Sequence, residues 1–301
     1  MKTELKSTLY TLGTVLMWST SATAFKLTLN GMNNIQLLFY SSLISTIVLG
    51  FFYYRKTHTT LKSFFKKEKI LSGIKLGFAN PFLYYIILFK AYSLLKAQEA
   101  LALNFTWPIA ISVFSWIFLN QKKNKTIIAG LLVAFIGVII ISTRGNIFDL
   151  SFDSPLGISL ALVSSIVWAS YWIMNLLDKR GDYEKLFNAF FYGTILVTIY
   201  VLLFDSFSVE KPISILGAVY IGLFEMGFGF IFWLKGLELS TNKARTSTLA
   251  YLSPFLSLAV IALVLGEPLL FSSIIGLGFI IGGISLQHLN FGKMFGIFSK
   301  K

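Results

Sequence analysis

The side chains that could do chemistry in this chain are a few polar residues inside long apolar segments. Glu225 is the clearest of them, because it stands within the apolar run 213–236. Placing Asp, Lys or Arg at the centre of a membrane span costs about 2.5–3.5 kcal/mol, so an ionisable residue there usually faces a cavity or a partner. A buried carboxylate can bind an ammonium group or take up a proton. The alternative is a structural hydrogen bond to a Ser or Tyr, or a position near the membrane interface.

The sequence contains no set of residues suited to metal, thiol or acid–base catalysis. The chain has no Cys, and its two His, His58 and His288, fall at or beyond the ends of apolar segments. No loop holds a His/Asp/Glu set suited to such chemistry, so we expect no enzyme, lipid-modifying or other, and no metal or cofactor. The net charge of +13 would fit a nucleic-acid ligand. The positions of the charges explain it better as a topology signal, so we expect no nucleic acid.

Aromatic and polar residues recur on matching helical stripes. The two stripes are Trp18, Ser21 and Phe25, and Trp168, Tyr171 and Asn175. A ligand with an apolar body and charged ends needs aromatic walls and a few fixed polar groups. The same stripes would also fit core packing or an interfacial aromatic belt. The predicted substrate-binding residues are Trp18, Ser21, Asn80, Tyr84, Asn104, Trp107, Trp168, Tyr171, Glu225 and Tyr251.

Other residues inside the segments have mainly structural interpretations. Lys235 lies near a segment end, where lysine extends to the interface, and Glu238 is placed to pair with it. Lys26 is interpreted as a similar anchor, with guidance of a substrate carboxylate as the alternative. Pro108 and Pro254 each free a backbone carbonyl and are expected to kink their helices.

The apolar segments that must position these residues fill most of the chain. Of its 301 residues, 55% are hydrophobic and 13% charged, too few charges to cover a soluble domain. A membrane span needs about 20 apolar residues, and its backbone must satisfy its own hydrogen bonds, which predicts helices. The ten predicted spans are 8–29, 35–54, 70–90, 98–119, 126–143, 156–177, 186–204, 213–236, 246–265 and 270–288. The chain is therefore expected to be an all-α, multi-pass membrane protein.

The loop charges predict how these spans are oriented. With the N-terminus in the cytoplasm, 19 Lys and Arg residues fall on the cytoplasmic side and three on the other side. Positive residues collect on the cytoplasmic side of membrane proteins. Both termini are thus expected in the cytoplasm of a bacterial inner membrane. The basic tail 290–301 mixes Phe with Lys, as suits contact with anionic lipid.

The sequence repeats itself after about 145–150 residues, or five spans. Asn80 then matches Glu225, Trp18 matches Trp168, and Pro108 matches Pro254. An odd number of spans places the halves, 1–145 and 154–289, in opposite orientations. Such inverted repeats are the architecture of secondary transporters, which bind substrate near the midplane between the halves.

The last predicted span contains a pair of glycines at helical spacing. Gly278 and Gly282 are four residues apart, a spacing that permits close helix approach. We expect them to pack within the bundle, and a dimer contact is the alternative. The protein is accordingly expected to be a monomer or a homodimer.

These motifs resemble the drug/metabolite transporter superfamily and its EamA-type ten-helix members. The resemblance covers nearly the whole chain and is carried by Trp18-Ser19, by Pro108 and Pro254, and by the turn 265–268, Leu-Gly-Glu-Pro. The first half departs from the family pattern at Asn120-Gln121, where the glutamate of a Gly-Glu turn would stand.

A narrower resemblance is to the bacterial aromatic amino-acid exporters of the YddG type. It is carried by 104–108 (Asn-Phe-Thr-Trp-Pro), Asn120-Gln121-Lys122, 130–138 and 168–171. It implies export of aromatic or other neutral amino acids, or related amphiphiles, through a central cavity. The expected mechanism is alternating access, with membrane lipid as surroundings and protons as a possible coupling ion. The alternatives are transport of another small metabolite or a cationic drug, and a non-transporting scaffold.

Overall fold

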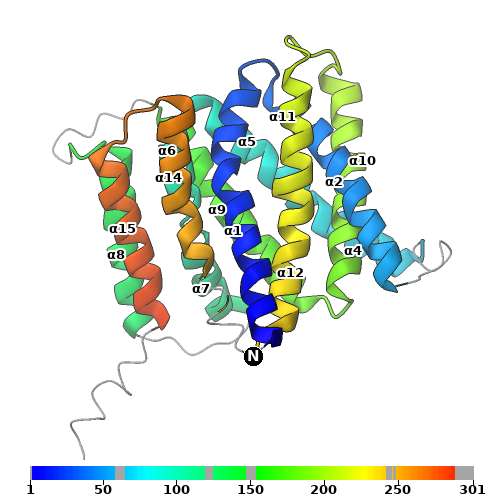
Figure 1. The fold of residues 1–301 in the computed structure, drawn as a ribbon, viewed down its shortest axis with the longest axis horizontal. Coiled ribbons are helices and arrows are strands. Elements are labelled where there is room, and N and C mark those ends of the chain that lie inside the picture. Colours follow the sequence, from blue (N-terminus) through cyan, green and yellow to red (C-terminus); the bar gives the residue numbers. More distant parts are fainter. Residues whose placement is uncertain are drawn as a thin grey trace, which may run out of the picture.

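The computed structural model describes residues 2–57, 65–118, 125–146, 154–241, 246 and 249–288, and over these the chain is helical without any strand (Figure 1). Five helical segments are long and apolar enough to cross a membrane. They are α2 (Asn34–Thr57), α4 to α5 (Lys67–Leu94), α9 (Pro155–Leu177), α10 (Asp182–Phe204) and α11 to α12 (Ser214–Leu239). The others are α1 (Lys2–Leu29), α6 (Ala97–Asn104), α7 (Trp107–Phe118), α8 (Lys125–Ser142), α14 (Leu252–Leu265) and α15 (Phe271–His288).

Each of the ten predicted spans coincides with a helical segment of the structure, and the span 98–119 covers both α6 and α7. The largest difference is at α1, which begins at Lys2, six residues before the predicted start. The tail 290–301 and the Asn120-Gln121 turn lie outside the described residues. The predicted all-helical membrane fold is confirmed.

Four of the segments are interrupted near their middle or start. The π-helical turn η1 (Phe78–Leu83) separates α4 (Lys67–Gly77) from α5 (Tyr84–Leu94), and η2 (Ile221–Phe228) separates α11 (Ser214–Tyr220) from α12 (Gly229–Leu239). Non-helical backbone at Asn80 precedes Pro81, which cannot donate a backbone hydrogen bond. The sequence had not predicted either π-helical turn.

The remaining two interruptions lie just before the prolines that were expected to kink their helices. The chain breaks at Phe105-Thr106 ahead of α7, and the short 3₁₀ turn η3 (Leu249–Tyr251) precedes α14. Pro108 and Pro254 therefore lie in the first turn of a new helix, where proline is well tolerated. The helix restarts at each proline instead of bending around it.

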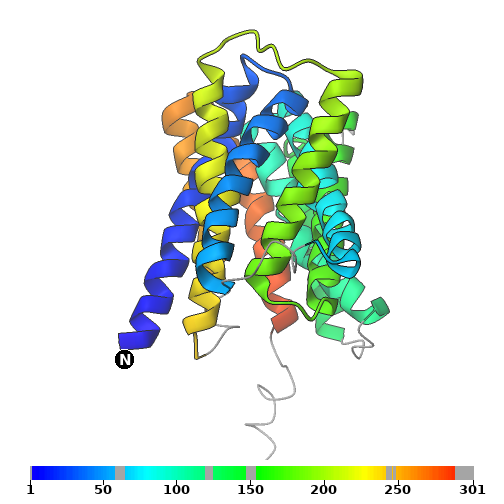
Figure 2. The same cartoon turned by 90° about the vertical axis from the view of Figure 1, so that its right-hand side faces the viewer.

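The two first helices of the predicted halves run in opposite directions. We call the end of the bundle where α1 begins the N-side (Figures 1 and 2). Lys26, near the end of α1, reaches the carbonyl oxygen of Leu95, and Leu95 also lies against Gly157 at the start of α9. The end of α1 and the start of α9 are thus together on the side opposite the N-side.

Each half contributes to every major helix contact. Helix α1 packs against α12 and α14, and α9 packs in the same way against α5, α6 and α7. Helix α2 packs against α10 and η2, while α10 packs against α4 and η1. Helices α8 and α15 pair with each other at the edge of the bundle (Figure 1).

Close helix approach depends on glycine at two crossings. A Cβ on Gly77 would lie 2.5 Å from the Ala189 carbonyl oxygen, and one on Gly137 would lie 2.4 Å from the Gly276 carbonyl oxygen. A Cβ added at Gly278 or Gly282 would instead meet no described atom within 4 Å. The prediction that this pair packs within the bundle is therefore wrong, because α15 turns a different face towards α8.

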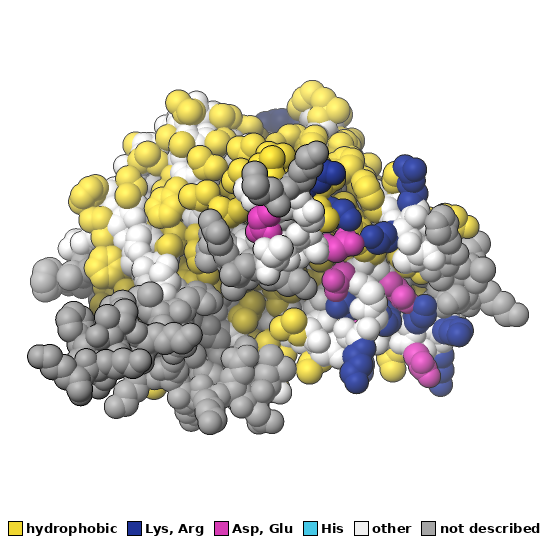
Figure 3. All heavy atoms as spheres, turned by 60° about the horizontal axis from the view of Figure 1, so that its bottom comes forward, with side chains coloured by type: hydrophobic (Ala, Val, Ile, Leu, Met, Phe, Trp, Pro, Cys, Tyr) yellow, Lys and Arg dark blue, Asp and Glu magenta, His cyan; other side chains and the backbone are white. Residues whose placement is uncertain are grey.

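Charged side chains gather on the N-side, as Figure 3 shows in dark blue and magenta. The ion pairs there are Lys56–Glu238, Lys235–Glu238, Lys69–Glu184, Arg180–Asp178 and Lys185–Asp182. The predicted pairing of Lys235 with Glu238, at 3.1 Å, is confirmed. Surface pairs of this kind stabilise a fold weakly, so they mark the edge of the apolar region more than they hold it together.

Candidate substrate-binding cavity

A cavity of about 400 Å³ lies inside the bundle. Its walls come from α1, α5, α6, α7, α9, η2, α12 and α14, so both predicted halves contribute. Eleven of the 24 described residues that line it are aromatic, so aromatic rings form much of its wall. A pocket of this size and composition fits a small ligand with an apolar or aromatic body.

Eight of the ten predicted binding residues line this cavity. They are Trp18, Ser21, Tyr84, Asn104, Trp107, Trp168, Glu225 and Tyr251. The other two, Asn80 and Tyr171, do not line it and are almost fully buried, with exposed fractions of 0% and 1%. Neither amide atom of Asn80 makes a hydrogen bond in this structure.

Glu225 is held in the cavity wall by residues of the other half. Its Oε2 accepts a hydrogen bond from Ser21 Oγ at 2.6 Å, and its Oε1 accepts one from the Tyr85 hydroxyl at 3.2 Å. The indole Nε1 of Trp18 donates to the Glu225 backbone carbonyl at 3.3 Å. These hydrogen bonds, from two different helices, hold the Glu225 carboxyl group in a fixed position. Tyr85 was not predicted from the sequence; it is buried behind the wall, whereas its repeat partner Phe230 lines the cavity.

Aromatic contacts join the two halves beside the cavity. Trp168 lies against Tyr84 with ring centroids 4.6 Å apart, and Trp18 lies 5.6 Å from Trp233. Phe230 contacts both tryptophans, at 5.9 Å from Trp168 and 6.0 Å from Trp18. Tyr171 stacks on Trp168 at 5.6 Å from behind, which is why it lies outside the cavity. Ring pairs of this geometry add about 0.5–1.5 kcal/mol each beyond the area they bury.

Asn104 holds a fixed place at the end of α6. Its Nδ2 donates to Ser164 Oγ at 2.9 Å, and the Tyr84 hydroxyl donates to its Oδ1 at 3.4 Å. Because the helix ends at the break before α7, the amide is held beside the cavity by side chains of two other helices.

The cavity opens on the N-side and is closed at its other end. Leu176, near the N-side end of α9, lines it and is 64% exposed. At the other end Phe25 and Tyr92 are buried, and Lys26 Nζ donates to the carbonyl oxygens of Tyr92 and Leu95 at 2.9 and 2.7 Å. Lys26 therefore caps the end of α5, in line with its interpretation as an anchor.

The described wall of the cavity holds one acidic side chain. Glu225 is the one Asp, Glu, Lys or Arg among the described lining residues. The described residues also include no group of three or more His, Cys, Asp or Glu placed to hold a metal ion. A wall of this kind attracts a cationic group next to an apolar body.

Apolar membrane helices from two halves that enclose a cavity with an acidic side chain in its wall are the architecture of a small-molecule transporter. The profile of the EamA-like transporter family matches this chain twice, over residues 5–143 and 155–287. The chain belongs to that family, and it is a multi-pass inner-membrane protein.

Named relatives agree with this family. An uncharacterized transporter of Archaeoglobus fulgidus is 30% identical over 59% of this chain and 62% of its own length. The aromatic amino acid exporter YddG of Escherichia coli is 29% identical over 64% of this chain and 68% of its own length. The YddG of Salmonella typhimurium is 28% identical over 59% and 62%. The chain thus spans less than two thirds of the length of some of these relatives.

A solved crystal structure shares the fold over the whole bundle. It superposes with a TM-score of 0.67 and covers 93% of this chain and 96% of its own, at 20% sequence identity. This likeness concerns the fold alone.

Proposed function

We propose that this protein is a secondary transporter that exports aromatic or other neutral amino acids, or related amphiphiles, by alternating access. The observation that carries the proposal is the ring-walled cavity with the Glu225 carboxylate fixed in its wall. A substrate ammonium would bind the carboxylate and its apolar side chain would lie among the rings. The two YddG relatives, which are named aromatic amino acid exporters, support this substrate class.

Two inverted repeats, 1–145 and 154–289, would provide the moving parts. The opposed directions of α1 and α9 support this, as do the interruptions η1 and η2 in the third helix of each half. Rocking of one half against the other would close the N-side and open the opposite side. With both termini in the cytoplasm, as the loop charges predict, the present conformation faces inward.

A second candidate is the transport of a cationic amphiphile. The specific observation in its favour is that no Lys or Arg is among the described residues that line the cavity. An amino-acid carboxylate would therefore have to bind neutral donors, such as the Asn104 amide or the Ser253 hydroxyl. A monovalent aromatic amine needs no such partner.

The test is competition for flux across proteoliposomes. Purified protein would be reconstituted and loaded, and entry of labelled Phe or Trp measured against an excess of Trp, tryptamine or indole-3-propionate. Inhibition by Trp above tryptamine supports the amino-acid substrate, and the reverse order supports the cationic amphiphile. Absence of flux for every amino acid and amphiphile in the panel would refute both. A pH gradient across the same vesicles tests whether protons are the coupling ion.

A further inference from the structure

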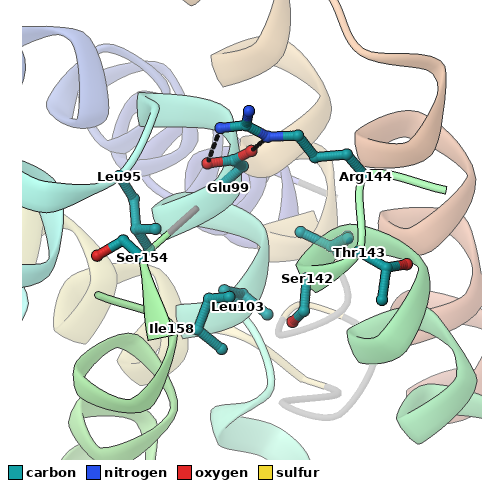
Figure 4. A pocket seen from close by; sticks show the side chains of 9 residues that line it. Leu95, Glu99, Leu103, Ser142, Thr143, Arg144, Ser154 and Ile158 are labelled. Carbon is teal, nitrogen blue, oxygen red and sulfur yellow. Dashed lines mark hydrogen bonds and ion pairs between the residues drawn. The ribbon is translucent and has the colours of Figure 1, made fainter. Parts of the chain in front are cut away.

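The short helix α6 separates two pockets. One of its faces, with Leu101 and Asn104, lines the central cavity. The opposite face, with Glu99 and Leu103, lines a second pocket of about 200 Å³ between α6, α8 and α9 (Figure 4). A single helix is thus the partition between them.

The second pocket lies on the side opposite the N-side. It is lined where α8 ends and α9 begins, by residues such as Arg144 and Ser154. Its floor is apolar, with Leu95, Leu103 and Ile158 below the charged rim (Figure 4). Unlike the central cavity, its described lining contains no aromatic residue and includes both an acid and a base, Glu99 and Arg144.

A partly buried ion pair closes the rim of this pocket. Arg144 Nε donates to Glu99 Oε1 at 2.6 Å; the Glu99 side chain is 7% exposed and the Arg144 side chain 34%. Glu99 Oε2 also accepts from the Lys96 backbone N–H at 3.3 Å, at the start of α6. Removing Arg144 is costly, because it leaves the buried Glu99 carboxylate without its partner.

The start of α6 is also tied to the loop before α15. The Ala97 backbone N–H donates to Glu267 Oε1 at 3.2 Å. The Gln98 side chain donates to the Pro268 carbonyl at 3.0 Å and accepts from the Leu270 N–H at 2.9 Å. These three bonds join the first predicted half to the second. At its other end α6 is separated from α7 by the break at Phe105-Thr106, so the two are not one continuous helix.

We propose that the second pocket is the outer end of the transport path and that α6 is its gate, latched by the Glu99–Arg144 pair. The apolar body of the departing amphiphile would pass over the floor at Leu103 once the pair separates. Movement of α6 would join this pocket to the central cavity. The inference rests on the proposed alternating access and assigns its outer barrier to particular residues.

Cysteine labelling tests this gate, since the chain has no Cys of its own. Leu103→Cys places a thiol on the floor of the second pocket, and Leu176→Cys, as the matched control, places one at the mouth of the central cavity. Each is combined with Glu99→Gln or with Arg144→Gln in reconstituted vesicles. A membrane-impermeant maleimide is then applied from one side at a time.

The gate predicts that both charge-removing variants raise labelling of Leu103→Cys from the side opposite the N-side. The expected increase is roughly tenfold, the equivalent of about 1.4 kcal/mol. Labelling of Leu176→Cys from the N-side should fall at the same time, because opening one side closes the other. Unchanged labelling at Leu103→Cys would overturn the proposal.

Two further outcomes would also overturn it. An increase at both thiols would assign the pair to stability alone, and an increase with Glu99→Gln but not Arg144→Gln would assign the effect to the start of α6. Labelling needs no cargo, so this result is independent of the flux assay. If the flux assay refuted the proposed substrate class, cysteine labelling would still test the gate.

Discussion

Replacing Glu225 by Gln should selectively weaken the binding of ligands that carry an ammonium group. The two side chains have nearly the same shape, and both oxygen positions of Glu225 are already hydrogen-bonded, to Ser21 and to Tyr85. The Gln oxygen can accept from the Tyr85 hydroxyl, and its amide nitrogen can donate to Ser21 Oγ. The substitution therefore removes the charge and leaves the network in place.

The size of the effect follows from the surroundings of the carboxylate. Removing one partner of a buried, hydrogen-bonded charge pair costs about 2–5 kcal/mol. The cavity is open on the N-side, so the lower end of this range applies, and about 2 kcal/mol corresponds to a roughly 30-fold loss of affinity. Phenethylamine should show this loss, whereas uncharged phenethyl alcohol should bind both proteins equally.

Calorimetric titration of the purified protein with both ligands measures these affinities directly. Glu238→Gln is a matched control, because that carboxylate pairs with Lys56 and Lys235 outside the cavity. It should change neither affinity. Equal binding of phenethylamine to the wild type and to Glu225→Gln would refute the role of the carboxylate. An equal loss for phenethyl alcohol would show that the substitution acts on the cavity shape instead.

Three other predictions concern the walls and the fold. Trp168→Ala should weaken the binding of Phe about tenfold, because it removes an aromatic contact worth about 0.5–1.5 kcal/mol together with apolar contact area. Calorimetric titration measures the affinity, and an unchanged affinity would contradict the prediction. Gly77→Ala should lower stability by about 1–3 kcal/mol through collision with α10, measured as a lower melting temperature, whereas Gly278→Ala should cause no loss. Burial favours a higher pKa for the Asp178 carboxyl, but its hydrogen bonds with Arg180 outweigh this and hold the pKa below its ordinary value. Its contribution is therefore complete above the unfolded-state pKa and is lost as the pH falls through the lower folded value; melting curves from about pH 3 to 6 should show this loss in the wild type but not in Asp178→Asn.

Hydropathy, loop charge and the repeat were enough to predict the helices and eight of the 24 described residues of the cavity wall. Apolar segments of about 20 residues have no stable alternative to a helix in a membrane, so their positions follow from composition. Pairing by the repeat then selected Trp18 with Trp168, and both line the cavity. This worked because matching positions in the two halves lie close to the same interface.

The same reasoning placed Asn80 and Tyr171 in the cavity, where the structure does not have them. Asn80 matches Glu225 in the repeat, but it precedes Pro81 and has extended backbone, while no described residue of η2 is a proline. The local backbone therefore turns the two side chains differently. Tyr171 shares a helix face with Trp168, but its ring stacks on the Trp168 ring on the side away from the cavity. Sequence periodicity predicts which face of a helix a residue lies on, but it does not predict how far that residue lies from the cavity.

The side on which the cavity opens could likewise not be predicted from the sequence, because it is a property of one conformation. The contacts that close the other side, from Glu99 to Arg144 and from Gln98 to the loop before α15, join residues 45 and about 170 positions apart. No short sequence motif identifies such pairs. The Glu99–Arg144 pair forms within the first half, and the Gln98 contacts form because the two halves pack against each other.

Counterflow in proteoliposomes tests the central claim most directly. Vesicles are loaded with a high concentration of unlabelled Trp and diluted into a trace of labelled Trp. A carrier whose single site faces each side in turn should take up the label transiently above its equilibrium level, and Glu225→Gln should reduce this overshoot. Uptake that rises only to equilibrium, or none above empty vesicles, would contradict the account.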